Sequence, residues 1–199
     1  MLNGETSESE FWTWSRCKER ISALRGRLGF EDTPTLRFLK LKLSLDNGEV
    51  FDELKGRRVS EYSKKAIYCI LYGYAGAVQV PETSVLTSFR HLPGGRIYYS
   101  VYAQRVLNPL ARFFGENPRR LVEAAEILGG AKLELEDYSV VVRALPLVPI
   151  TIVLRSATEE FSASANIYYD SSVSNYLSTE ETVMLSELTV KRLRDALKP

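Results

Sequence analysis

Hydrophobic and polar residues alternate along this chain with two different periods, and each period predicts a type of element. In residues 8–28 the apolar side chains recur at helical spacing, with Trp14 and Ile21 among them, and basic residues fill the remaining positions. This pattern predicts an amphipathic N-terminal helix over 8–28. Ser7 and Glu10 fit a capping box at its start, and we expect residues 1–7 to form a disordered tail.

Residues 36–45 follow a period of two, with leucines at alternate positions and Lys or Ser between them. That alternation predicts one half-buried strand. A tight turn is expected at Asp46–Glu49, and Val50 and Phe51 are expected to pair back on the strand. Ser60 then predicts the cap of a largely buried helix that ends near Ala75.

The rest of the chain predicts further helices, a run of strands and a final helix. Helical patterns cover 98–114, with a kink or break expected at Pro109, and 118–128, and Thr179 is expected to cap a last helix. Four strand candidates lie between them, at 131–136, 138–144, 149–155 and 163–169. The predicted class is α+β: an antiparallel sheet of about five strands packed by four to five helices, in a single domain over 1–199.

Composition narrows the class of protein without giving a function. A hydrophobic fraction of 45% and a charged fraction of 26% are typical of globular domains. The two cysteines, Cys17 and Cys69, lie on apolar faces and are expected to be buried, reduced thiols. Because there is no CxxC or Cys/His cluster, we expect neither a structural zinc site nor a Cys-ligated iron–sulfur cluster, and the cofactor is left unknown.

Charge is distributed unevenly along the chain. The net charge of the chain is +1. Residues 1–120 carry 19 Lys/Arg and 13 Asp/Glu, whereas residues 121–199 carry 7 Lys/Arg and 12 Asp/Glu. The halves could form a basic and an acidic face, or folding could interleave them. Nucleic-acid binding is disfavoured, because dedicated binders are more basic. The polar start and the lack of a long apolar run predict a cytoplasmic protein without membrane association.

The segment 89–96 is the first candidate site. Adjacent glycines allow a backbone to approach a ligand, and cationic side chains beside a helix start favour an anion. A tyrosine-rich set, including Tyr98 and Tyr102, could line a groove next to it. The alternative is a plain Pro-Gly-Gly turn. The candidate residues in the segment are Arg90, His91, Gly94, Gly95 and Arg96.

Carboxylates near the end of the chain form the second candidate. Glu160 and Asp170 flank a predicted strand, and two such groups could hold a divalent metal or act as an acid–base pair. The alternative is a solvated turn, with Asp170 bonded to the backbone of the residues that follow it. Nucleophilic catalysis has little support, because the single histidine, His91, has no recognisable nucleophile motif around it.

Several short motifs occur in a recognisable order: "SFRHLPGG", "LARFFGENP", "AAEILGG", "LPLVPITIVL", "EEF" and "YYDSSVSNYL". With this order, residues from about 54 to 193 resemble an uncharacterised family of archaea and anaerobic bacteria, domain of unknown function 3786. The sequence departs from the family pattern at 155–158, where a tryptophan and an acidic residue are expected. Positions that match the pattern are Glu160, Phe161, Asp170, Tyr176 and Leu177.

The resemblance implies an accessory role in anaerobic metallo-cofactor or one-carbon metabolism. Some relatives carry a four-cysteine iron–sulfur segment, which this chain lacks, so that inference does not transfer. The leading hypothesis is a non-catalytic ligand-binding or accessory module, with a small molecule or a protein as partner. One alternative is a metal-dependent enzyme that uses Glu160 and Asp170. Another is a protein–protein adaptor with an apolar patch at Trp12 or the last helix.

Overall fold

The computed structural model describes residues 11–198, and the predicted tail and the Ser7–Glu10 capping box lie outside that range. The first helix, α2, spans Trp14–Ser22. It is shorter than the predicted helix over 8–28, because residues 23–29 form turns instead. Gly26 and Gly29 adopt φ values of 66° and 81° there, which favour glycine and end the helical run.

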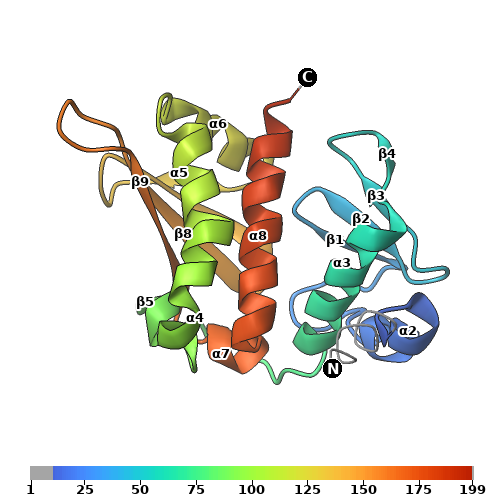
Figure 1. The fold of residues 1–199 in the computed structure, drawn as a ribbon. Helices are drawn as coiled ribbons and strands as arrows, with labels where there is room; N and C mark the ends of the chain where they lie inside the picture. Colours follow the sequence, from blue (N-terminus) through green and yellow to red (C-terminus); the bar gives the residue numbers. More distant parts are fainter. Residues whose placement is uncertain (1–10, 199) are drawn as a thin grey trace, which may run out of the picture.

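A small antiparallel sheet follows, with its strands in sequence order (Figure 1). The strands are β1 (Thr35–Phe38), β2 (Leu41–Ser44), β3 (Val50–Asp52) and β4 (Arg57–Arg58). The prediction of one strand over 36–45 is therefore wrong: the chain turns at Leu39 and Lys40, both of which have positive φ. The sequence signal was a change of parity: the buried apolar residues fall at even positions in β1, Leu36 and Phe38, and at odd positions in β2, Leu41 and Leu43.

The second sheet contains the meander that the C-terminal half predicts. Its strand order is β5-β9-β8-β7-β6, and every neighbouring pair is antiparallel. The predicted class, α+β with an antiparallel sheet of about five strands, is confirmed. The fifth strand is not among the predicted ones, however, because β5 comes from a segment for which no strand is predicted. The strands are β5 (Leu86–Ser88), β6 (Ala131–Leu133), β7 (Tyr138–Leu145), β8 (Val148–Arg155) and β9 (Ser164–Asp170).

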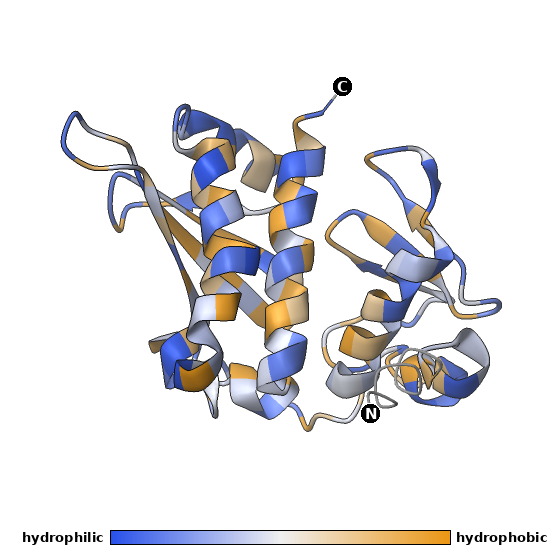
Figure 2. Cartoon of the chain, in the orientation of Figure 1, coloured by the Kyte–Doolittle hydropathy of each residue, from blue (hydrophilic) through white to orange (hydrophobic). Residues whose placement is uncertain are grey.

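Helices cover one face of this larger sheet (Figure 1), and hydrophobic residues of the sheet lie behind them (Figure 2). A π-helical turn, Ala103–Leu107, joins two of the helices without a break. The break predicted at Pro109 does not occur, because the helical run continues through it directly after the π-helical turn. The helices here are α4 (Gly95–Tyr102), α5 (Asn108–Phe114), α6 (Arg119–Ile127), α7 (Val173–Tyr176) and α8 (Thr179–Ala196).

The two halves of the fold meet where α8 lies beside α3 (Glu61–Tyr74) (Figure 1). Ser60 caps α3, as predicted, and its hydroxyl accepts from the backbone N–H of Ser63. The cap of α8 is Ser178 rather than Thr179, because Ser178 and Glu181 form a reciprocal capping box. No helix within residues 11–198 is long and apolar enough to cross a membrane.

Both cysteines are buried and not disulfide-bonded, as predicted. Cys17 packs in α2, where burial raises the pKa of its thiol. Ion pairs connect the basic and acidic parts of the chain, as between Arg105 and Glu187. Folding thus joins charges from the two halves directly.

Candidate functional site

The segment 89–96 forms a compact turn at the start of α4. Gly94 adopts φ 72°, and a side chain at Gly95 would overlap the carbonyl oxygen of Phe89. The Arg90 guanidinium lies 3.7 Å from the centre of the Tyr99 ring, and His91 Nδ1 lies 3.1 Å from Ser88 Oγ. The glycines therefore have a conformational role in this turn, and Arg90 is occupied by an intramolecular contact.

The remaining candidates of this segment do not converge on one point. Arg96 and Tyr98 are exposed on α4, whereas Tyr102 is buried and stacks on Phe89 with ring centres 4.0 Å apart. The hydroxyls of Tyr102 and Tyr169 are 2.8 Å apart, and Tyr169 also reaches Ser186 on α8. Burial raises the pKa of Tyr169 to about 12, so this chain of neutral hydroxyls belongs to the core between sheet and helices.

Asp170 has a structural environment at the end of β9. One carboxylate oxygen accepts from the backbone N–H groups of Thr83 and Ser172, and the other accepts from that of Ser84 at 2.7 Å. Burial alone would raise the pKa of Asp170, but hydrogen bonds from Ser172 and Thr83 lower it to about 2. Asp170 therefore joins the segment before β5 to the end of β9.

Glu160 lies far from Asp170, because β9 separates them. Glu160 is exposed in the connection before β9, and Asp170 is the last residue of that strand. At about 3.3 Å per residue, the strand alone spans about 20 Å. The two carboxylates do not share a site, and no group of three or more His, Cys, Asp or Glu residues within 11–198 could hold a metal ion.

A cleft of about 680 Å³ lies between α3 and α8, and none of the candidate residues from the segment 89–96, the tyrosine set or the carboxylate pair lines it. The β3–β4 region closes one end, with Lys55 and Arg57 at its edge. Ser63, Ala66 and Cys69 contribute one face of α3, and Met184, Leu188 and Lys191 contribute one face of α8. Both sets recur every three to four residues, so each helix presents one stripe of side chains to the cleft.

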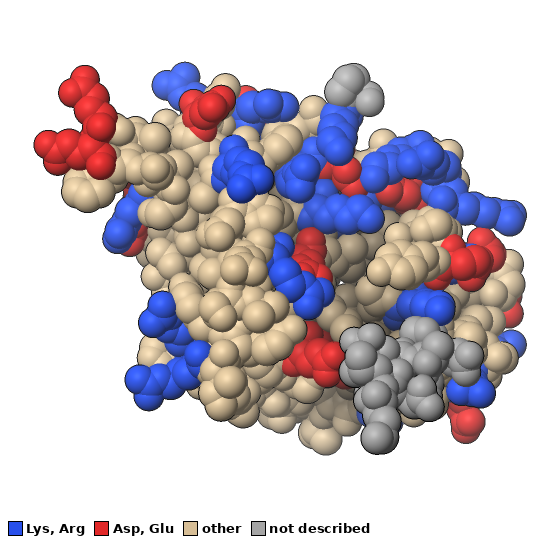
Figure 3. Space-filling view, in the orientation of Figure 1, with Lys and Arg blue, Asp and Glu red and all other residues tan. Residues whose placement is uncertain are grey.

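Cationic side chains dominate the charged lining of the cleft. Seven Lys and Arg residues line it, against two carboxylates, Asp52 and Glu187. Basic residues gather at the end near β4 and the end of α8 (Figure 3). Arg57, Lys65 and Lys191 form no ion pair with any residue in the described range 11–198. These three side chains leave uncompensated positive charge around the cleft.

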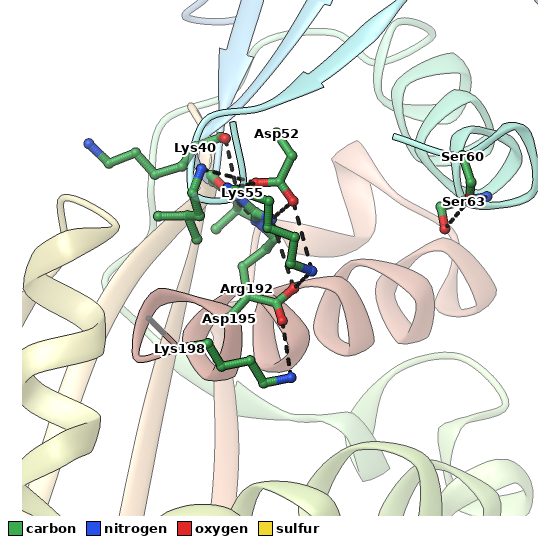
Figure 4. Close-up of polar contacts among 10 residues, drawn as sticks. Lys40, Asp52, Lys55, Ser60, Ser63, Arg192, Asp195 and Lys198 are labelled. Atoms are coloured by element: carbon green, nitrogen blue, oxygen red, sulfur yellow. Dashed lines mark hydrogen bonds and ion pairs between the residues drawn. The ribbon is translucent and has the colours of Figure 1, made fainter. Parts of the chain in front are cut away.

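A buried ion-pair cluster fixes the cleft wall at this end (Figure 4). Arg192, only 2% exposed, donates to the Asp52 carboxylate at 2.7 Å and to the carbonyls of Leu39 and Lys40 at 2.9 and 3.1 Å. Lys55 Nζ lies 2.5 Å from the Asp195 carboxylate. Burial alone would raise the pKa of Asp52, but the hydrogen bond and charge of Arg192 lower it. The cluster ties α8 to the small sheet.

Arg105 reaches the cleft from the π-helical turn between α4 and α5. It forms an ion pair with Glu187 of α8, and the hydrogen bond to Glu187 raises the pKa of the guanidinium. A π-turn holds one more residue than an α-turn and occurs frequently at functional sites. Arg105 and Arg192 thus hold the only two carboxylates among the described lining residues, and neither carboxylate is left to attract a cation.

The opposite end of the cleft is apolar and aromatic. Trp12 lines it and packs edge-on against Phe11 and Tyr72, with ring centres 5.0 and 5.8 Å apart. Trp12 is half-buried, so it is a packing residue as well as a lining residue. The adaptor hypothesis named an apolar patch at Trp12 or the last helix, and Trp12 lines this cleft together with Met184 and Leu188 of that helix.

Residues 22–192 match the model of a protein family described as Domain of unknown function (DUF3786). The chain belongs to this family. The DUF3786 match begins well before residue 54, so it includes the small sheet and the β3–β4 side of the cleft. Neither a curated protein nor a solved structure matches the chain.

Sequence reasoning missed the cleft because its residues are spread over the chain. Trp12 and Arg192 mark the ends of the set, and its two main groups, in 52–69 and 184–192, are more than 100 residues apart in sequence. One available signal was Lys191, a basic residue that follows Met184 and Leu188 along one face of a helix. Another was the adjacent pair Arg57 and Arg58 before a helix cap.

Proposed function

We propose that this DUF3786 protein is a non-catalytic binding module that holds a small anionic ligand in the cleft between α3 and α8. The observation that carries the proposal is the set of Arg57, Lys65 and Lys191, which line the cleft and pair with no carboxylate in residues 11–198. A bound anion would supply the missing negative charge. The cleft volume of about 680 Å³ falls in the range of about 300–1,000 Å³ for small-molecule sites.

The state of the cleft's other charged groups supports binding over catalysis. Asp52 and Glu187 are both held by arginines, so neither is placed as a free general base. The Arg192 cluster fixes the wall before any ligand arrives, and such preorganisation lowers the entropic cost of binding. Lys and Arg on a fixed wall are the side chains that recognise phosphate and carboxylate groups.

Calorimetric titration of the whole chain with pyrophosphate, citrate and octyl phosphate tests this proposal. Binding of at least one probe should be saturable and should weaken as salt is added, because salt screens exposed charges. The variants Lys65→Glu and Lys191→Glu should each reduce the affinity about tenfold or more. The matched control is Lys18→Glu, which makes the same charge change on the exposed face of α2, outside the cleft.

Two results would overturn the proposal. One is the lack of saturable binding for all three probes. The other is an equal loss of affinity in Lys18→Glu and Lys65→Glu, which would attribute binding to overall charge rather than to the cleft. Unchanged unfolding midpoints of the three variants ensure that a loss of binding is not a loss of folding.

A further inference from the structure

The cleft carries most of its cationic side chains at one end and Trp12, Cys69 and Met184 at the other, and from this we infer the chemical class of its ligand. We propose that the ligand is an amphiphilic organic anion: a phosphate or carboxylate group attached to an apolar body. The inference rests on the proposed function and specifies the ligand that the function leaves open. It depends on the relative direction of α3 and α8, which the contacts at the two ends of the helix pair establish.

The two helices run antiparallel beside the cleft (Figure 1). At one end, a side chain at Gly73, near the end of α3, would overlap the carboxylate of Glu181, near the start of α8. At the other end, Lys55, which precedes α3, binds Asp195 near the end of α8. The start of α3 therefore lies beside the last turns of α8.

The cationic end of the cleft lies at the start of α3. Arg57 comes from β4, just before the helix, and Lys65 lies in its second turn. Lys191 lies in the last half of α8, next to Arg192 of the buried cluster. Several cationic donors are therefore available together at this end for an anionic group.

The apolar end lies about two turns further along α3, where Cys69 lines the cleft together with Met184 of α8 and Trp12. Ala66 directly follows Lys65, so it lies between the two ends. Ala66 is an exposed alanine on a helix face, and its small side chain leaves room that a larger residue would fill. An anion made only of charged groups would leave this half of the cleft without contacts, whereas an apolar body would remove it from water.

Titration with octyl phosphate, octanoate, inorganic phosphate and octyl glucoside, all below micelle-forming concentrations, separates the two ends. Octyl phosphate or octanoate should bind at least about tenfold more tightly than inorganic phosphate, since burial of only two methylenes gives about that factor. Either should also bind at least about tenfold more tightly than the neutral octyl glucoside. Whichever of the two anions binds more tightly identifies the head group as phosphate or carboxylate.

The variant Ala66→Phe fills the space between Lys65 and the apolar end and leaves every cation in place. It should remove the advantage of octyl phosphate over inorganic phosphate. Ala157→Phe is the matched control, because it makes the same change at an exposed position in the connection between β8 and β9. That control should bind all four probes as the parent chain does.

The outcomes separate this inference from the proposed function. Equal affinities for octyl phosphate and inorganic phosphate, both reduced by Lys65→Glu, would overturn the amphiphile and leave an anion-binding module. Tight binding of octyl glucoside would overturn the role of the cations. Failure of every probe would overturn both proposals. A dimer in analytical ultracentrifugation that Lys65→Glu and Ala66→Phe both dissociate would put a second copy of the chain in the cleft and overturn the small ligand.

Discussion

Replacement of Asp170 by Asn should destabilise the protein strongly at neutral pH, although the two side chains have nearly the same size. The carboxylate accepts backbone hydrogen bonds from Thr83, Ser84 and Ser172. An asparagine offers one acceptor oxygen, and its amide N–H₂ would face a backbone donor on the other side. The substitution thus removes a buried charge together with the hydrogen bonds that stabilise it.

The pKa of Asp170 sets the size of the effect. It falls from an ordinary value of 3.8 to about 2, and one pKa unit corresponds to about 1.4 kcal/mol, so the folded state stabilises the carboxylate by roughly 2.5 kcal/mol. Asp170 is only 6% exposed, so solvent screening reduces this value little. Because the folded pKa is the lower one, the stabilisation is present above the unfolded pKa and is lost as pH falls towards 2.

Urea unfolding of the parent chain and Asp170→Asn at pH 7 and pH 3 measures both quantities. The difference in unfolding free energy should be roughly 2.5 kcal/mol at pH 7 and smaller by about 1 kcal/mol at pH 3. Asp46→Asn is the control: Asp46 lies exposed in the turn after β2, and its substitution should change stability by less than about 0.5 kcal/mol. A difference for Asp170→Asn that stays constant between the two pH values would refute the reasoning.

Two further predictions concern the contacts of the small sheet. Arg192→Met should lower the unfolding free energy by about 3–5 kcal/mol, because it leaves the buried carboxylate of Asp52 without its cation. In urea unfolding, adding Asp52→Asn should recover part of that loss. A loss below about 1 kcal/mol for Arg192→Met would contradict the buried pair. Gly48→Ala and Gly56→Ala both place alanine at positive φ, 75° and 62°. This backbone conformation should lower the unfolding free energy by about 1 kcal/mol in each variant. Only at Gly48 would the new Cβ overlap the ring of Trp14. Thermal unfolding should therefore show Gly48→Ala to be less stable than Gly56→Ala by at least about 1 kcal/mol. Equal losses of stability in the two variants would contradict the contact with Trp14.

Local burial patterns account for the parts of the fold that the sequence predicted. The strands β7 and β9 and the helix α8 bury mainly one face or stripe, each with its own period, whereas β8 and the middle of α3 are continuous apolar runs that are buried on more than one side. Such patterns record which side of an element meets the core, and they do not depend on what the element meets. The family resemblance likewise depended on local motifs, and the DUF3786 match confirmed it.

The hairpin turn at Leu39 and Lys40 shows what local patterns could not supply. Neither residue favours positive φ, and no Gly, Asn or Asp marks the turn. The turn is held by Arg192, which donates to both carbonyls from about 150 residues further along the chain. A period of two that changes parity hints at such a turn, but the guanidinium that binds both turn carbonyls comes from a distant part of the chain.

The candidate cleft depends on tertiary structure in the same way. From the sequence alone, Glu160 and Asp170 looked like a pair because they flank one strand, yet that strand holds them apart. Lys65 and Lys191 are distant in sequence, yet they line one cleft because α3 and α8 pack side by side. The sequence by itself determined which face of each element is buried. Only the tertiary structure decided which charges share a space, because long-range electrostatic contacts depend on how elements pack and leave no local periodic signal.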